Sequence, residues 1–445
     1  MNFAAFLFIL LATYLRPVEL LFPDWAIYRP MIWVSLLALV IVLAAKASGE
    51  KSAGTGRNFV QMLLLVLAIA ASLMAHFEFG NAVAAVMQFS PNALLFGLAL
   101  LTVNSLGRLK ITIFFFVACI FSLSVAGVGA YYTGFLAQTL VLKQNVDEGD
   151  DVEQIPAEES EIPAEDTSGK YLWRVTSFGL LADPNEFAQA IIVTLPLIAG
   201  LFVRGRYIWN IVMVVLPTLF MLFAIYLTHS RGALLGTASL LFFGIRRMLG
   251  TIRTAVLLAV VGAAVMATNI SGGRAFSTQE ESAGGRIDAW SEGLKMFMSY
   301  PFLGVGYGHF TDNHYLTAHN SFVLCFAELG LIGYVIWLGM IIVSFKEMNL
   351  SIAQAPVGSE ERKWTMLLMV SFIGFLTCSF FLSRTYTPGL YMLMGLCICA
   401  SHCVREEFPS PEGGAASAVP MRWIGVSLFF ALASLVLFYL IIRLR

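Results

Sequence analysis

Long apolar stretches separated by short polar ones run through almost the whole chain. A helix that spans a bilayer needs roughly 20 mostly apolar residues. The stretches are apolar on all sides, whereas the strands of a membrane barrel alternate apolar and polar residues. The pattern therefore predicts an all-α polytopic membrane protein of about 12–13 transmembrane helices. The candidate spans are Phe3–Leu15, Met31–Ala45, Phe59–Ala75, Ala82–Val103, Ile111–Val128, Glu186–Val203, Tyr207–Leu227, Gly232–Ile245, Thr254–Asn269, Ser321–Phe345, Trp364–Leu382, Tyr386–Cys403 and Trp423–Ile442.

Lysine and arginine residues gather in alternate connections between these spans. Cytoplasmic loops retain basic residues, so we expect these connections and the N-terminus to be cytoplasmic. With thirteen spans, Arg443 and Arg445 would lie outside, which the same rule disfavours. The basic connections contain Lys46, Lys51 and Arg57, then Arg108 and Lys110, then Arg204 and Arg206, and then Arg246, Arg247 and Arg253.

The composition supports a membrane protein. Of the 445 residues, 58% are apolar and 12% are charged, whereas soluble domains carry about 25% charged residues. The net charge of −1 gives no indication of a nucleic-acid partner. The six cysteines lie in or beside apolar runs, which favours packing residues over a disulfide framework. We expect residues 1–445 to form a single integral-membrane domain.

Two polar segments are expected on the external side of the membrane, which is periplasmic if the resemblance described below holds. Lys143–Lys170 holds ten acidic residues and two lysines, and the rest of the chain then has a net charge of +7. Its prolines and few apolar residues predict a flexible loop, most simply a solvated spacer. The segment 270–320 is amphipathic and long enough to indicate a functional loop. Within it, Ile287–Met298 has the pattern of a helix that lies near the membrane surface.

No ordinary cofactor motif is present. The chain has no Walker A pattern and no GxGxxG after a strand. The GxGxG run at Gly304–Gly308 is better explained by tight turns. Cys397, Cys399, His402 and Cys403 form a loose cluster, which we interpret as packing residues in preference to a metal site. We therefore expect neither a metal nor a cofactor.

Polar residues at the external ends of helices remain as candidates for chemistry. Charges at the edge of a membrane are costly and are usually functional. The candidates are Thr228-His229-Ser230-Arg231, His319-Asn320-Ser321 with Glu328 farther along, Arg384 between Ser383 and Thr385, and Arg174 and Arg286 in external loops. Lipid-linked phosphates are available on this side, and arginine grips phosphate with two parallel hydrogen bonds.

Simpler explanations exist for several of these residues. Arg231 or Arg384 could extend to lipid headgroups as an anchor. His229 is more readily explained as a boundary residue than as a catalyst, and His309 and His314 as loop surface residues.

Four motifs occur in one order between about Phe178 and Tyr334. They are LADPNEFAQAIIVTLPL, SRGALLG, GGRIDAWSEGLKMFMSYPFLGVGYGHF and HNSFVLCFAELGLIG. The last reads His-Asn, nine residues, Gly, two residues, Gly. Together they resemble the O-antigen ligase and O-antigen polymerase (Wzy-type) superfamily of membrane glycan transferases.

The resemblance implies a fold, an activity and site residues. It implies a glycosyltransferase of the C type (GT-C) that takes a glycan from undecaprenyl diphosphate and passes it to an acceptor hydroxyl at the periplasmic face of the bacterial inner membrane, without metal. The HN-x9-GxxG motif maps onto His319, Asn320, Gly330 and Gly333. The R-x3-L motif maps onto Arg231 and Leu235, and the loop arginine with its tryptophan onto Arg286 and Trp290.

The chemistry of these residue types agrees with that activity. Arg231 and Arg286, with Arg384, could offset the charge on a departing diphosphate. Arg174 is a further candidate for substrate binding. His319 has a suitable pKa to deprotonate the acceptor. Packing of Gly330 and Gly333 against a neighbouring helix would hold His319 in place.

Alternatives remain open both for the acceptor and for the class of function. Ligases of this family use lipid A–core, polymerases use a second lipid-linked glycan, and a third group uses protein. A membrane transporter or lipid flippase would also fit many spans with few charges. Transporters tend to have internal repeats and broken helices, and no repeat is evident here. A non-catalytic scaffold would leave the external arginines unexplained.

Overall fold

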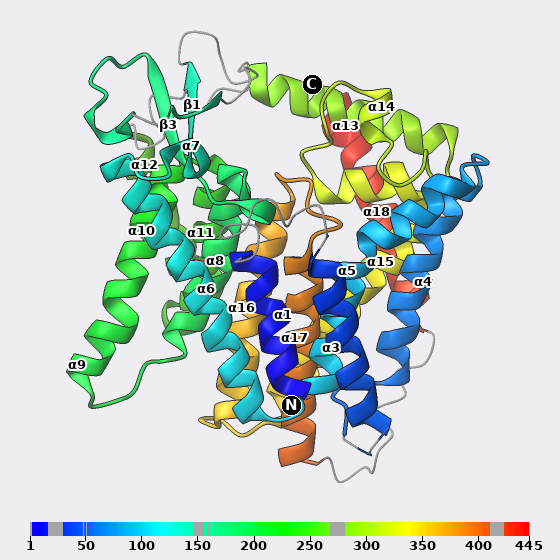
Figure 1. Cartoon of the computed structure of the whole chain (residues 1–445), viewed down its shortest axis with the longest axis horizontal. Coiled ribbons are helices and arrows are strands. Elements are labelled where there is room, and N and C mark those ends of the chain that lie inside the picture. Colours follow the sequence, from blue (N-terminus) through cyan, green and yellow to red (C-terminus); the bar gives the residue numbers. More distant parts are fainter. Residues whose placement is uncertain are drawn as a thin grey trace.

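The protein is described here from a computed structural model that covers residues 2–16, 30–47, 49, 51–145, 155–158, 161–267, 281–409 and 422–444. Its helices form a bundle that runs between two ends (Figure 1). The chain begins at the lower end, and the last helix finishes at the upper end, where a small sheet also lies. The protein is thus an all-α polytopic membrane protein that carries one small sheet.

The first half of the described chain contains α1 (Asn2–Leu15), α3 (Pro30–Ala47), α4 (Gly56–Met74), α5 (Phe79–Thr102), α6 (Leu106–Thr133), α7 (Ala137–Leu140), β1 (Val141–Asn145), β2 (Ile155–Pro156), the 3-10 helix η2 (Pro163–Glu165), β3 (Tyr171–Val175), the 3-10 helix η3 (Gly179–Leu181) and α8 (Pro184–Ala199). The second half contains α9 (Tyr207–Asn210), the π-helix η4 (Ile211–Val215), α10 (Leu216–Thr228), α11 (Arg231–Leu249), α12 (Thr251–Ala267), α13 (Glu281–Ser299), α14 (Phe310–Asn313), α15 (Ser321–Gln354), α16 (Glu360–Ser379), α17 (Pro388–Glu407) and α18 (Arg422–Arg443).

Six of the described helices are long and apolar enough to cross a membrane. They are Gly56–Met74, Phe79–Thr102, Leu106–Thr133, Tyr207–Thr228, Ser321–Gln354 and Trp423–Arg443, and three shorter apolar helices accompany them. Several other expected spans are shorter or more polar. For example, α16 begins with four charged residues in a row. The expected total of about thirteen crossings therefore stays a prediction.

The helix α15 is the centre of the bundle. It packs against α4, α16, α17 and α18, while α16 packs against α8 and α11. Most of α15 is buried inside the protein, whereas α18 exposes large apolar side chains such as Phe429. A bilayer is the environment in which such an outward apolar surface is favourable.

The expected single span Ser321–Phe345 is wrong in one respect, because α15 is broken at Gly330. This residue has φ 61° and ψ −166°, which is not helical. The backbone N–H groups that lose their helical partners at the break form hydrogen bonds with the preceding loop. The N–H groups of Leu331 and Ile332 donate to the carbonyls of Pro301 and Phe302 at 2.8 and 3.2 Å.

The same loop also satisfies the other side of the break. The N–H groups of Val305 and Gly306 donate to the carbonyls of Ala327 and Glu328 at 3.0 and 3.1 Å. The broken helix is therefore stable because the loop replaces its lost hydrogen bonds. Gly304 lies so close to the Glu328 backbone that no side chain would fit there.

We expected a flexible loop at Lys143–Lys170, but both ends of this segment are ordered by a small β-sheet and its side-chain contacts. The strand β1 pairs antiparallel with both β2 and β3, and Lys143 lies opposite Trp173. The Lys143 ammonium contacts Glu161 at 3.0 Å. The Trp173 indole N–H donates to Asp166 at 2.6 Å. Hydrogen bonds from Ser168 and Trp173 lower the pKa of Asp166. Residues 146–154 and 159–160 lie outside the described residues.

The predicted surface helix at Ile287–Met298 is present and longer than expected, as α13. It lies across the upper end of the bundle (Figure 1) and packs against α15 and α18. Residues 270–280 of the expected functional loop lie outside the described residues.

Candidate active site

Helices that contribute candidate residues begin at the same end of the bundle, and capping residues explain where they begin. The Asp183 carboxylate accepts from the N–H of Asn185 at 2.8 Å and thereby starts α8, with Pro184 in the first position. Ser230 caps α11 in the same way, and Asn320 caps α15. Proline also stands at the start of α17.

The loop 380–387, between α16 and α17, lies where these helices meet. The Ser321 hydroxyl donates to the carbonyl of Leu382 at 2.6 Å and accepts from the backbone N–H of Arg384 at 2.7 Å. The Thr385 hydroxyl donates to the Ser321 carbonyl at 2.7 Å. The start of α15 is therefore fixed to the backbone around Arg384.

His319 precedes this junction and has a constrained backbone. Its φ of 45° is in the left-handed region, which residues other than glycine rarely adopt. On one side, the Asn320 amide donates to the carbonyl of Phe380 at 2.8 Å. On the other side, the indole N–H of Trp290 donates to the carbonyl of Ala318 at 3.0 Å. The backbone on both sides of the partly exposed imidazole is thus held in place.

Arg231 is the first residue of α11 and is partly buried. A Cβ on the next residue, Gly232, would lie 3.6 Å from the Cβ of Phe381. The start of α11 therefore lies against the loop 380–387. His229, which ends α10, also has a left-handed backbone, with φ 48°.

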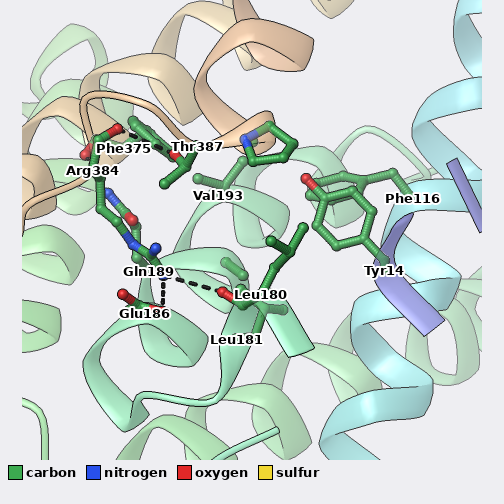
Figure 2. A pocket seen from close by; sticks show the side chains of 13 residues that line it. Tyr14, Phe116, Leu180, Leu181, Glu186, Gln189, Val193, Phe375, Arg384 and Thr387 are labelled. Atoms are coloured by element: carbon green, nitrogen blue, oxygen red, sulfur yellow. Dashed lines mark hydrogen bonds and ion pairs between the residues drawn. The ribbon is translucent and has the colours of Figure 1, made fainter. Parts of the chain in front are cut away.

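Arg384 points to the other side of its loop, toward α8 (Figure 2). Its guanidinium forms an ion pair with Glu186 and donates to the carbonyl of Leu180 at 3.3 Å. These groups line a cavity of about 50 Å³ together with Tyr14 and Gln189. Burial lowers the pKa of Arg384, and the Glu186 carboxylate offsets part of that shift. The guanidinium remains charged at neutral pH.

Arg174 bridges two elements. On β3, its Nε donates to the carbonyl of Thr228 at 2.9 Å, and its Nη2 donates to the Asn185 side chain at 3.1 Å. The side chain is buried. It thus links the end of α10 to the beginning of α8.

These contacts connect into a closed set that we name the polar ring. Arg174 links α10 to α8, Glu186 links α8 to the loop 380–387, and that loop contacts the starts of α15 and α11. The polar ring consists of Arg174, Asn185, Glu186, Arg384, Ser321, Asn320, Phe380, Phe381, Gly232, Arg231 and Thr228.

The helix α13 packs beside the polar ring. The Trp290 ring contacts those of Phe380 and Phe438, both at 5.5 Å between centroids. Arg286 lies one turn before Trp290 and is partly buried. Residues four apart share one helix face, so Arg286 and Trp290 lie on the same side of α13.

The motif glycines have roles different from the one expected. Gly330 packs against the backbone of Phe302 and Leu303, and forms the break in α15. The space beside Gly333 is filled by the Leu329 side chain, from across that break in the same helix. The expectation that a neighbouring helix packs on both glycines is therefore wrong. Leu235 is exposed on α11, one turn after Arg231.

One carboxylate near these residues, Glu186, was not selected from the sequence. Glu186 pairs with Arg384, although it lies in the quoted LADPNEFAQ motif. Its position three residues after a capping aspartate was a usable signal. Glu328, which the sequence analysis did name, is buried and accepts from the backbone N–H of Phe310 at 3.3 Å.

The cysteine cluster shows no arrangement for a metal. Cys397, Cys399 and Cys403 are free and buried. Within the part of the chain that the structure describes, no group of three or more His, Cys, Asp or Glu side chains is arranged to hold an ion.

Comparison with known proteins gives one family. Residues 216–338 match the model of the family described as O-Antigen ligase. No curated protein matches the chain. The matched segment contains Arg231, Arg286, His319, Asn320 and both motif glycines, but neither Arg174 nor Arg384. This match over residues 216–338 supports membership of the chain in the O-antigen ligase and polymerase family.

Proposed function

We propose that this protein transfers a glycan from undecaprenyl diphosphate to an acceptor hydroxyl at the periplasmic face of the inner membrane. Family membership supports an O-antigen ligase or polymerase activity in polysaccharide biosynthesis. The finer statements are our proposals: a GT-C architecture, a metal-independent reaction, and lipid A–core, a second lipid-linked glycan or a protein as the acceptor. We also propose that residues 1–445 form one domain with segments 143–170 and 270–320 on the periplasmic side.

The observation that carries the proposal is the convergence of helix starts and arginines at the polar ring. The helices α8, α11, α15 and α17 all begin there. A helix start carries a partial positive charge and favours anions. Arg231 adds a full charge at one of these starts. The matched segment 216–338 contains Arg231 and Arg286 but not Arg384, so we assign the larger share of diphosphate binding to Arg231 and Arg286.

The proposed reaction is a single displacement. His319 accepts the proton of the acceptor hydroxyl, and the oxygen forms a bond to the anomeric carbon. The bond from that carbon to the diphosphate oxygen breaks, and its electron pair leaves on the diphosphate. Arg231 and Arg286 stabilise the charge on this leaving group. Attack opposite the leaving group inverts the anomeric configuration.

The remaining residues have supporting roles in this proposal. Asn320 holds the backbone beside His319 through its bond to Phe380. Arg174 acts as a positioning residue, since its hydrogen bonds to Thr228 and Asn185 tie helix ends together. Trp290 orients α13, and with it Arg286, toward Ala318.

One observation favours the alternative of a transporter or flippase. A broken helix such as α15 is common in transporters. Here the loop 301–306 fills the break with backbone hydrogen bonds. The broken helix thus serves as an anchor for the segment that leads to His319, which favours the transferase.

The test uses purified protein in detergent with undecaprenyl-diphosphate glycan, an acceptor and a chelator. We expect the glycan to appear on the acceptor, with free undecaprenyl diphosphate as the second product. Proteoliposomes assayed for movement of the same lipid provide the comparison. Lipid movement without transfer would support the flippase, and loss of transfer on adding chelator would contradict the metal-independent reaction.

A further inference from the structure

A groove between α15 and α16 opens on the side of the bundle below the polar ring. It has a volume of about 440 Å³ and an almost wholly apolar lining. The seven lining residues are all partly exposed, although α15 is mostly buried elsewhere. They are Phe322, Phe345, Ile373, Leu376, Thr377, Phe380 and Phe381.

The upper end of the groove is continuous with the polar ring. Phe380 lines the groove with its side chain, while its carbonyl accepts from Asn320. Phe381 lines the groove and contacts the start of α11 at Gly232, next to Arg231. A diphosphate held at Arg231 and beside His319 would therefore lie directly above the groove.

The lower end of the groove lies within the apolar part of the bundle. The Phe345 ring stacks with that of Phe372 at 4.8 Å between centroids, which joins α15 to α16 there. From Ile373 to the end of α16 at Ser379, the groove extends about 9 Å at a helical rise of about 1.5 Å per residue. This run leads away from the charged end of the site and into the region that lipid occupies.

We propose that this groove binds the first isoprenoid units of the donor lipid. The inference rests on the proposed function. It identifies the path by which the lipid chain of the bound donor extends from the site into the bilayer. A diphosphate bound at the cationic end requires its chain to continue into the bilayer, and this groove begins at that point. Transfer from lipid tails into an apolar groove gains little hydrophobic energy. Its contribution is therefore contact packing, and alignment of the anomeric carbon with His319.

The test fills the groove with larger side chains. In Ile373→Trp and Leu376→Trp, the indole would occupy space that the isoprenoid chain needs. Each variant is assayed with a full-length undecaprenyl-diphosphate glycan and with a short donor in which a methyl group replaces the whole polyprenyl chain. The matched control is Leu219→Trp, on the exposed surface of α10.

We expect the variants to raise KM for the full-length donor about tenfold, which corresponds to about 1.4 kcal/mol of binding free energy. The effect on the short donor and the effect of Leu219→Trp should both be much smaller. Equal losses with both donors, or no loss with either, would overturn the inference.

A second measurement separates this inference from the proposed function. A photo-crosslinking amino acid at Thr377 is exposed to full-length undecaprenyl-diphosphate glycan in phospholipid vesicles. Capture of the polyprenyl lipid is expected. If the Thr377 crosslinking variant captures it but the wild-type protein transfers no glycan, the proposed function fails and the groove assignment stands. If transfer occurs but only phospholipid is captured, the groove assignment fails alone.

Discussion

At the residue scale, Arg384, which lies in the loop 380–387, and Arg231, which lies beside that loop, have different surroundings. Arg384 is paired with Glu186 inside a small cavity. Arg231 lies at the start of α11, where the helix dipole adds to its charge. In our account, Arg231 grips the diphosphate with its planar fork.

Arg231→Lys should therefore be nearly as damaging as Arg231→Ala. Lysine keeps the charge but loses the bidentate geometry. We expect kcat/KM to fall by about 10²-fold or more in both, as for loss of a charge-stabilising donor. The measurement is transfer kinetics with purified donor. Retention of most activity in the lysine variant would reduce Arg231 to a point charge or a lipid anchor.

Residue-level prediction from the sequence had a clear limit. Asn320 stands close before an apolar run, and Ser230 is separated from one by Arg231, so local pattern was sufficient to find these helix starts. The pairing of Arg384 with Glu186 joins residues far apart in the chain, and no local pattern reveals it. The same is true of Arg174, whose partners lie on α8 and α10.

At the element scale, the break in α15 determines how His319 is presented. The sequence pattern predicts one straight span because the apolar run continues through Gly330. Hydropathy does not report backbone dihedral angles, so the break was not foreseen. The segment 321–329 is consequently a separate piece, fastened at one end to the loop 380–387 and at the other to residues 301–306.

Gly330→Ala should destabilise the fold. The positive φ and overlap with the Phe302 backbone leave no room for a methyl group. Backbone strain of this kind costs about 1–3 kcal/mol, and the overlap adds to it. We expect lower yield of folded protein and a lower Tm in detergent. Gly425→Ala, with nothing close to its Cβ position, is the control. Equal Tm values for the two variants would contradict this account of the break.

At the scale of the whole molecule, the bundle separates two kinds of surface. The polar ring and the small sheet lie at the upper end, and the loop between α15 and α16 lies at the lower end (Figure 1). The basic connections found in the sequence support a cytoplasmic lower end. The sequence predicted this polarity from charge alone, but it did not foresee the sheet, because its strands flank an acidic segment with the composition of a spacer.

Cysteine labelling in intact cells tests the orientation. On a background without the six native cysteines, Ser168→Cys and Thr311→Cys should react with a membrane-impermeant reagent, since both residues are exposed and expected outside. Val357→Cys, exposed between α15 and α16, should react only after permeabilisation. The reverse pattern would invert the orientation.

The central claim is that His319 activates the acceptor, and one substitution tests it most directly. His319→Ala should lower the transfer rate by about 10²–10⁴-fold, the usual contribution of a general base. Expression and binding of undecaprenyl-diphosphate glycan should be largely unchanged. His309→Ala and His314→Ala are controls and should have mild effects. The measurement is single-turnover transfer from purified donor with chelator present, alongside donor binding. Near-normal turnover in His319→Ala would contradict the account, and loss of donor binding would instead make His319 a phosphate ligand.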